Sequence, residues 1–449
     1  IFNNGFKMID MIYLAQADEV TPAVIEQKTT AMQQSGMIHS KVAGRFEVVK
    51  TLPKKADDFD SMFDYADAFG KFRLAYINSA HKISANPDKV EKSASSFGGE
   101  FGFNTAELHG LQLHIAAYVS QGLTFLNPDK NDLNEDFFGR NLESFAYIAE
   151  ASIDYNSDIF QTRVGRVKVE TPYANSDDIR MAPNTFEGAW ANIDYSDNLN
   201  TQLLYFKRWA GYDSQDEGVG AFQNKFKYLV DDQSFGMAGA SLTYKYAKNS
   251  ELSFWYNYID NMSAIAYAEI IGIYFIDGEE LHLDYGFQAS NIQELDNSNV
   301  DGNVLGTMAI LHYKGSFIGG AYNLAQSDEG NYVTNGFGGG PYYTSLDEAT
   351  ISAISEGAAT SGISASNNNA EAFRIGTGYE FENISLDGLV LELVYGELYN
   401  DNGRITEKDA IVTYDITDRW YLEATYTNYE SSCTNNTFDR ALVRLDYTF

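Results

Sequence analysis

A polar segment in the first half of the chain carries the residues best suited to act on ions. Residues 170–189 combine charges of both signs with two prolines, which favours a structured loop. Asp177, Asp178, Arg180 and Asn184 lie within this segment. Fixed charges select among passing ions when they lie on a wall of low dielectric constant, because their field is then weakly screened. We therefore expect these four side chains to recognise small charged solutes.

Covalent catalysis has no comparable support in the sequence. No Gly-x-Ser-x-Gly motif is present and the six histidines are scattered, which leaves no recognisable nucleophile and base. The glycine-rich run 336–341 lacks the Lys and Ser/Thr of a phosphate-binding loop, so we expect a turn-rich loop there. The sequence predicts neither an enzyme nor a cofactor.

An acidic run at 129–136 is the first candidate for a metal site, and the acidic segments 213–217 and 231–232 are weaker ones. Asp129, Asn131 and Asp132 offer oxygen ligands, but the run lacks the glycine that an EF-hand has at its sixth position. We expect these residues to bind calcium weakly, with an ordinary solvated loop as the alternative.

Composition and charge limit the class of protein that positions these side chains. The 449 residues include 31 Tyr and 29 Phe but 7 Pro, a balance typical of a tyrosine-rich sheet protein. The net charge of -32 would repel phosphate backbones and excludes nucleic acid as a partner. No apolar stretch approaches the roughly 18 residues that a membrane-spanning helix needs.

Segments of about 10 residues with alternating apolar side chains recur from Phe69 to the last residue, each bounded by Gly, Asn, Asp or Ser. We predict strands at 69–79, 97–104, 110–120, 144–155, 160–169, 187–196, 200–209, 236–247, 250–260, 263–275, 279–290, 304–313, 316–326, 371–382, 388–400, 407–416, 419–430 and 437–449.

Short and long connections alternate along this series, as they do in outer-membrane barrels, which also have an even number of strands. The sequence therefore predicts an all-β fold: a transmembrane antiparallel β-barrel of about 18 strands in the bacterial outer membrane. Short periplasmic turns and long external loops would join its strands. A soluble sandwich or propeller is the alternative, but it would not sort its loops by length.

The last strand carries the most specific local signal. Ala441, Val443, Leu445, Tyr447 and Phe449 share one face, as expected for a strand that faces lipid. An ending on Phe449 resembles the terminal aromatic signal that the barrel assembly machinery recognises in outer-membrane proteins.

Residues 1–68 do not follow the strand pattern, whereas 69–449 do. Thr21-Pro22 and Gly36 predict a helix of about 14 residues between them, and residues 61–68 could add a short helical turn. We expect a partly helical extension that lies in the periplasm or plugs the barrel. The first 14 residues lack the pattern of a secretory signal, so we expect a processed chain.

The segment 170–189 resembles the third external loop of the OprD-like family of outer-membrane porins. The match consists of Pro172, Asn175, Ser176-Asp177-Asp178, Arg180, Pro183-Asn184-Thr185 and Gly188. The resemblance implies a loop that folds into the barrel and constricts it, with Asp177, Asp178, Arg180 and Asn184 at the constriction. The alternative is that Asp177 caps a turn and Asp178 pairs with Arg180, with none of them facing the lumen.

Strand parity identifies a second set of basic residues. Phe72, Leu74 and Tyr76 share the apolar face of the first strand, which turns Lys71 and Arg73 inward. The same argument places further basic residues on the lumen wall: Lys245, Arg374, Arg419 and Arg444. The resemblance implies a basic ladder that guides carboxylates, and ordinary water-facing side chains are the alternative.

These expectations combine into one function: passive diffusion of small hydrophilic solutes and ions across the outer membrane. The acidic charge predicts a preference for cations, and the resemblance implies amino acids or carboxylates as solutes. We expect a homotrimer in outer-membrane lipid, with acidic loops that bridge through divalent cations to lipopolysaccharide. A barrel plugged by residues 1–68, with a structural or adhesive role, is the alternative; an outer-membrane phospholipase lacks its catalytic residues here.

Overall fold

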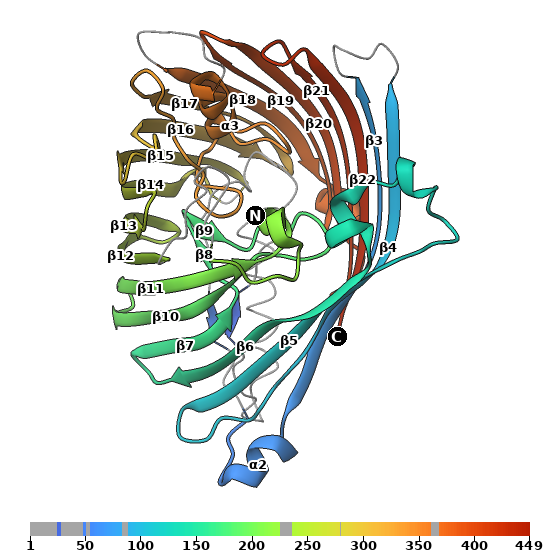
Figure 1. Cartoon of the computed structure of the whole chain (residues 1–449). Coiled ribbons are helices and arrows are strands. Elements are labelled where there is room, and N and C mark those ends of the chain that lie inside the picture. The colour runs from blue at the N-terminus through green and yellow to red at the C-terminus, as the bar shows by residue number, and fades with distance from the viewer. Residues whose placement is uncertain are drawn as a thin grey trace.

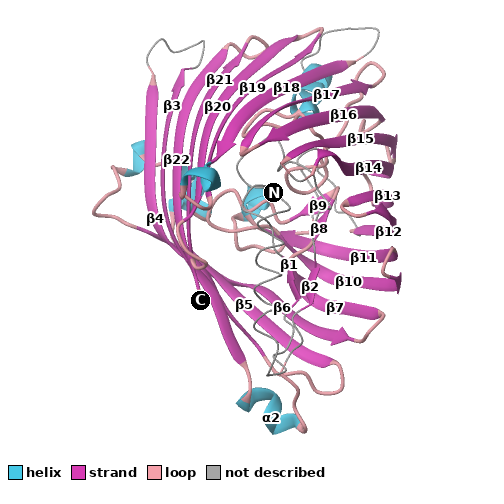
Figure 2. Cartoon of the chain, turned by 180° about the vertical axis from the view of Figure 1, so that it is seen from behind, coloured by secondary structure: helices cyan, strands magenta, loops and turns pink. Residues whose placement is uncertain are grey.

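The computed structural model describes residues 25–27, 48–50, 54–82, 89–224, 236–278, 280–360 and 368–449. Eighteen antiparallel strands pair side by side and close into one barrel (Figures 1 and 2). In chain order they are β3 (Asp67–Lys82), β4 (Val90–Asn104), β5 (Leu111–Gly122), β6 (Phe145–Asn156), β7 (Phe160–Val167), β10 (Thr185–Ser196), β11 (Leu199–Ala210), β12 (Met237–Ala247), β13 (Ser250–Ile259), β14 (Ser263–Asp277), β15 (Leu281–Glu294), β16 (Gly302–Tyr313), β17 (Ser316–Gln326), β18 (Ala370–Glu380), β19 (Leu389–Asn400), β20 (Gly403–Asp415), β21 (Trp420–Ser431) and β22 (Asn436–Thr448).

The barrel closes where the last strand pairs with the first. β22 runs antiparallel to β3, with Thr448 opposite Lys71 and Thr437 opposite Lys82. Because β3 and β22 pair with each other, neither is left as an edge strand with unpaired backbone N–H and C=O groups. A sheet in lipid needs all of these groups to be paired. The predicted fold class is confirmed.

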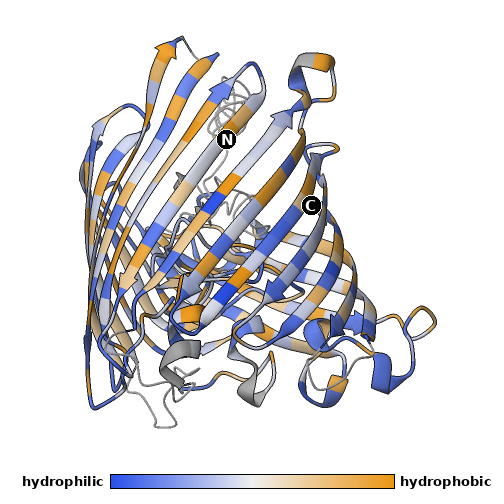
Figure 3. Ribbon diagram, turned by 90° about the horizontal axis from the view of Figure 1, so that it is seen from above, coloured by the Kyte–Doolittle hydropathy of each residue, from blue (hydrophilic) through white to orange (hydrophobic). Residues whose placement is uncertain are grey.

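Side chains alternate between the two surfaces of the wall. In β22, Val443 is exposed on the outer face, whereas Leu442, Arg444 and Asp446 are buried on the inner face. Figure 3 shows polar and apolar residues alternating in this way along the strands. The outer face carries a large set of exposed aromatic and aliphatic side chains, as lipid contact requires. No helix in the described ranges is long and apolar enough to cross a membrane.

The connections differ in length at the two ends of the barrel. Turns such as 197–198, 248–249 and 314–315 join strands at one end, which we assign to the periplasm. The other end carries long loops, which include the third loop (168–184) and the seventh loop (327–369). Both of these loops contact inner-face side chains of the wall strands.

The described residues before the barrel form a short strand pair and one short helix, and the helix α2 (Phe59–Asp64) lies beyond the periplasmic ends of the strands (Figure 1). β1 (Ile25–Gln27) pairs with β2 (Val48–Lys50), so the helix expected between residues 21 and 36 is wrong at 25–27; its other residues lie outside the described ranges. The helical turn expected at 61–68 is present as α2 (Phe59–Asp64), which starts at an Asp58 capping box and ends before β3.

Candidate functional site

The third loop leaves the wall and contacts strands on two sides of the lumen. Its small hairpin of β8 (Glu170–Thr171) and β9 (Ala174–Asn175) lies inside the ring of strands in both views of the barrel (Figures 1 and 2). The Tyr173 hydroxyl hydrogen-bonds Ser290 on β15, and the Asp178 carboxylate pairs with Arg73 on β3. Backbone of this loop therefore occupies part of the barrel cross-section.

Arg73 holds the loop through a buried network of charges. Its guanidinium spans two carboxylates: Nη1 and Nη2 lie 2.5 and 2.9 Å from Asp178, while Nε and Nη2 lie 2.9 and 2.8 Å from Asp446. Lys71 Nζ lies 2.7 Å from Asp178 Oδ2. Arg444 donates to the Asp178 backbone carbonyl and pairs with Glu423 at 2.7 Å. Planar two-point pairs of this kind fix geometry as well as charge.

These charges also set the ionisation of Asp178. Burial opposes ionisation, but the positive charges of Arg73 and Lys71 outweigh burial and hold the pKa of the Asp178 carboxyl well below its usual range. The anchor therefore stays charged, and the loop stays tethered, over the whole physiological range of pH.

Arg180 joins the third loop to two other loops. Its Nε lies 2.9 Å from Asp136 on η4 (Glu135–Phe137), and its Nη2 lies 3.2 Å from Glu348 of the seventh loop. Its guanidinium carbon lies 5.2 Å from the centre of the Tyr212 ring. Arg440 of β22 pairs with the same Glu348. Arg180 is thus a buried junction between loops.

The seventh loop meets the third loop in the lumen. Asn175 N donates to the Phe337 carbonyl at 2.9 Å, and Phe337 N donates to the Tyr173 carbonyl at 2.9 Å. Gly336, with φ of +74°, makes this crossing possible because an added Cβ would lie 2.4 Å from the Tyr173 carbonyl oxygen. The glycine-rich run that the sequence marked as a turn is therefore the contact between the two loops.

Side chains of the wall hold the rest of the seventh loop. The Tyr343 hydroxyl lies 2.7 Å from Glu269 of β14, and Arg374 of β18 donates to the Ser345 carbonyl at 2.6 Å. Glu407 of β20 accepts the backbone N–H groups of Glu348 and Ala349. The helix α3 (Ile351–Thr360) follows this stretch and lies against β17, β18 and β19.

A smaller set of charged side chains in this region is partly exposed. Lys71, Lys168 and Glu348 have side-chain exposures of 23%, 20% and 32%. Lys168 Nζ lies 3.5 Å from Glu100, which is the cross-strand neighbour of Lys71. Two partly exposed lysines therefore lie near one carboxylate, one by an ion pair and the other by strand register.

Two carboxyl groups of the loops have strongly raised pKa values. Burial and the neighbouring Asp177 carboxyl raise the pKa of Asp213 to about 8, while Asn184 donates to it at 2.6 Å. Burial raises the pKa of Glu170 to about 8, although Ser176 donates to it at 3.2 Å. Both groups titrate just above neutral pH.

The structure brings most of the predicted constriction residues together, with partners that the sequence did not identify. Asp178 pairs with Arg73 and Lys71, so the alternative in which it pairs with Arg180 is wrong. Asn184 is fully buried between the Asn175 carbonyl and Asp213 and does not face open lumen. Asp177 adjoins Asp213, with a φ of +37°.

The residues of the predicted basic ladder do not lie together in the structure. Lys71, Arg73 and Arg444 lie together, whereas Arg374 serves the seventh loop. The predicted position of Arg419 on the lumen wall is wrong. Its side chain lies exposed in the turn before Trp420, beside the Tyr447 hydroxyl, because the strand starts one residue later than predicted.

Lys245 and the calcium candidates lie away from this cluster. Lys245 is on the inner face of β12, near the periplasmic end and opposite Glu251. Asp129, Asn131 and Asp132 are exposed at η3 (Lys130–Asp132) of the second external loop. Weak calcium binding there stays a prediction.

Sequence reasoning missed the partners that hold the loops. They are Asp446, Glu423, Arg440, Asp347, Glu348, Lys168 and Glu100. The sequence did contain a signal for one of them. Asp446 is two residues from Arg444 in the last strand, so both side chains must share the inward face.

Comparison with known proteins places this geometry in a family. A family model described as outer membrane porin, OprD family, matches residues 135–410. Similar solved structures are a BenF-like porin from Pseudomonas fluorescens Pf-5 (TM-score 0.73, 13% identity), OpdK from Pseudomonas aeruginosa with vanillate (0.70, 14%) and OpdQ from Pseudomonas aeruginosa (0.66, 16%). The likeness covers 86%, 86% and 87% of this chain and 99% of each of those chains. No match was found among curated proteins.

Proposed function

Because this chain belongs to the OprD family of outer membrane porins, we propose that it lets small hydrophilic solutes and ions diffuse past a constriction formed by its third loop. The chain is an outer-membrane protein, and its family and fold are those of channels for small solutes and not of enzymes. The constriction, its selectivity and its solutes are our proposal.

One observation carries the proposal: the third loop is tied into the lumen by buried ion pairs. Removing one member of such a pair costs about 3–5 kcal/mol, because the remaining charge stays buried without its partner. Arg73 holds Asp178 with two hydrogen bonds, and Lys71 and Arg444 add further contacts. A loop fixed this firmly narrows the path of every solute.

A preference for cations follows from the balance of charge. The chain has 63 acidic and 31 basic residues, and carboxylates accompany Arg73, Lys168 and Arg180 at the third loop. Asp213 and Glu170 have pKa values raised to about 8, so these carboxyl groups lose their protons and become negatively charged above that pH. The local field then favours cations on their way through the lumen.

Lys71 and Lys168 support a narrower proposal, that solutes carrying a carboxylate also pass. Both lysine side chains are partly exposed; Lys168 pairs with Glu100, which is the cross-strand neighbour of Lys71, so the site offers both signs of charge to a zwitterion such as an amino acid. The similar OpdK structure contains vanillate, an aromatic carboxylate.

The test replaces both Asp177 and Asp178 by Asn and measures reversal potentials in a planar bilayer under a potassium chloride gradient. We expect the double variant to lose cation preference, because two acidic groups disappear from the third loop and Arg73 and Lys71 lose their shared partner Asp178. A matched control replaces Asp158 and Asp418, which are exposed in periplasmic turns. Equal reversal potentials for the double variant and wild type would place selection elsewhere.

Three earlier expectations stay predictions: the homotrimer, the contact with lipopolysaccharide and the alternative of a plugged barrel. Liposome swelling addresses the last of them. Vesicles with the full chain should swell in isosmotic amino acid faster than in a large oligosaccharide; no swelling with any solute would favour the plugged barrel.

A further inference from the structure

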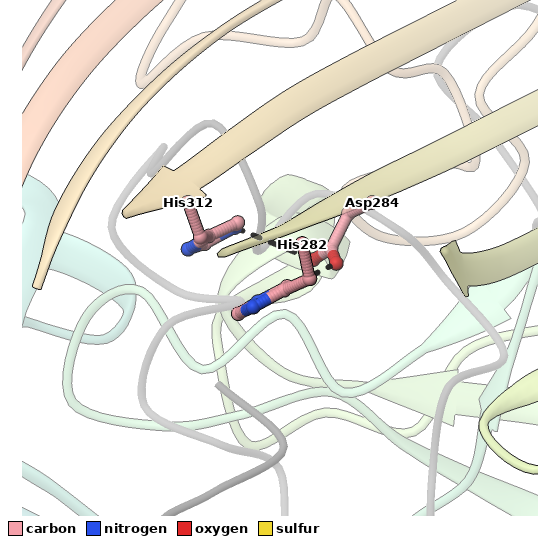
Figure 4. Close-up of side chains that lie close together, drawn as sticks. All are labelled: His282, Asp284 and His312. Atoms are coloured by element: carbon pink, nitrogen blue, oxygen red, sulfur yellow. Dashed lines mark ion pairs between the residues drawn. The ribbon is translucent and has the colours of Figure 1, made fainter. Parts of the chain in front are cut away.

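Three metal-ligating side chains meet on the lumen wall, away from the third loop. His282 and Asp284 are two residues apart on β15, and His312 of β16 lies directly opposite His282 in the register of the two strands. All three side chains point to the same side of the sheet (Figure 4). They lie near the periplasmic end, because β15 starts at Leu281 and β16 ends at Tyr313.

The distances within this cluster approach those of a coordination sphere. His312 Nε2 lies 3.5 Å from Asp284 Oδ2, and His282 Nε2 lies 4.0 Å from Asp284 Oδ1. One ligand atom from each residue can be chosen so that all lie within 4.8 Å of one another. Ligands at about 2.0–2.1 Å from a tetrahedral zinc ion are roughly 3.4 Å apart. Binding of zinc would therefore draw together ligand atoms that now lie within 4.8 Å of one another.

Burial restricts the side-chain motion of two of the three proposed ligands. Asp284 and His312 are 4% and 7% exposed, and Nε2 of His312 is buried without a hydrogen bond. A buried imidazole nitrogen without a hydrogen bond carries an energetic penalty that a bound metal ion would remove. His282 is the more exposed ring and can turn toward the ion.

The aromatic surroundings support the same arrangement. The two imidazole rings are stacked with centres 4.5 Å apart and planes inclined by 8°. Phe317 packs beside His312, and Phe275 beside His282, so that four rings form a row across four neighbouring strands. This row limits how far either histidine can move away from Asp284.

The ligand set indicates which metal would bind. Two imidazoles with one carboxylate are the ligands of open zinc sites, in which water takes the fourth position. Calcium and magnesium prefer an all-oxygen shell, which a single carboxylate does not supply. We propose that His282, Asp284 and His312 bind a divalent transition-metal ion of the zinc type at the periplasmic end of the lumen.

This site adds a property that diffusion through the lumen does not require. A bound ion places two positive charges on the wall, and this charge would oppose the passage of other cations. Zinc added on the periplasmic side should therefore lower the potassium current; this consequence alone rests on the proposed channel function.

Binding is tested directly on purified, refolded full-length protein without a histidine tag. Competition with a chromophoric zinc chelator should give one zinc ion per chain, and cobalt should give the intense visible absorption of a tetrahedral site. His312→Gln and Asp284→Asn should each weaken binding by more than about 10-fold, since even outer-shell changes at metal sites have effects of this size.

His109→Asn is the matched control, because His109 is exposed in a periplasmic turn and its φ of +52° suits Asn. Heat-dependent migration on a gel establishes that each variant is a folded barrel. Unchanged zinc affinity in folded His312→Gln and Asp284→Asn proteins, or no saturable zinc binding by the wild type, would overturn the proposal. Neither result would affect the proposed diffusion channel.

Discussion

The charged residues of the lumen differ in burial, and we propose that the buried ones hold the third loop whereas the partly exposed ones contact solutes. Arg73 and Arg444 are 1% exposed and have buried carboxylate partners, so their role is to hold the third loop. Lys71 contacts the same Asp178 but is partly exposed. This difference in burial predicts different effects for two neighbouring residues on one strand.

We predict that Arg73→Gln changes the single-channel current, whereas Lys71→Gln changes the ion selectivity. Without Arg73, the loop loses an interaction of about 3–5 kcal/mol, so single-channel currents should become larger and noisier. Lys71→Gln should shift the reversal potential toward cations with conductance nearly unchanged. Bilayer recordings of both variants test this assignment, and identical behaviour of the two would refute it.

A second residue-scale prediction concerns pH. Asp213 and Glu170 hold protons at neutral pH because burial, aided at Asp213 by Asp177, raises the pKa of each to about 8. Cation preference should therefore rise between pH 7 and pH 9. The raised pKa also means that the two groups favour folding most at low pH and that this contribution declines as pH rises toward 8.

The measurement is the reversal potential at a series of pH values for the wild type and for an Asp213→Asn, Glu170→Gln double variant. The double variant should show a flat profile over this range. A wild-type profile that is already flat would mean that these carboxyl groups do not act on permeating ions.

Among the larger elements, the third and seventh loops are joined inside the barrel by backbone hydrogen bonds. Gly336→Ala should weaken this crossing, because the new methyl group would collide with the Tyr173 backbone. Gly330→Ala is a stringent control: Gly330 has a similar φ of +82° in the same loop, but nothing lies within 4 Å of an added Cβ. Both variants therefore introduce the same kind of backbone strain, but only Gly336→Ala introduces a collision.

We expect Gly336→Ala to raise the rate of proteolytic cleavage in the third and seventh loops and to widen the distribution of conductance. Limited proteolysis of the folded barrel with peptide mapping by mass spectrometry measures the first effect. If Gly330→Ala and Gly336→Ala behave alike, the contact between the loops has no special importance.

The elements could be predicted from the sequence because their pattern is local. Alternation with period two located the strands, and the error was largest at β4, which starts at Val90 and not at residue 97. After Val90, residues 91–96 of this strand are Glu, Lys, Ser, Ala, Ser and Ser, and none of them is a large apolar side chain. Polar residues are tolerated there, so apolar alternation could not reveal them.

The site was less predictable because its partners are distant in the chain. Parity correctly turned Arg73 inward, but Asp178 and Asp446 lie 105 and 373 residues away from it. Such pairs arise from barrel closure and from the path of a loop, neither of which a local pattern encodes. The histidines appeared scattered for the same reason, although two of them face each other across β15 and β16.

At the scale of the whole molecule, the C-terminal residue takes part in closing the barrel. Phe449 exchanges backbone hydrogen bonds with Gly70, and its ring lies 5.3 Å from that of Phe72 on the outer face. Phe449→Ala keeps the backbone bonds but removes the proposed assembly signal. We predict a several-fold lower yield of folded barrel in the outer membrane, with normal conductance for the channels that form.

Heat-dependent gel migration of outer-membrane fractions measures this yield. Phe103→Ala, which removes another exposed outer-face aromatic side chain, is the control. Equal yields for the two variants would show that Phe449 acts as an ordinary lipid-facing residue.

The proposed function requires that the barrel remains open around its third and seventh loops. Single-channel recording of the wild-type chain in a planar bilayer, under a potassium chloride gradient, decides whether it does. We predict stable open steps and a reversal potential that shows cation preference. Fully inserted barrels that pass no current would contradict it and would mean that the lumen is closed.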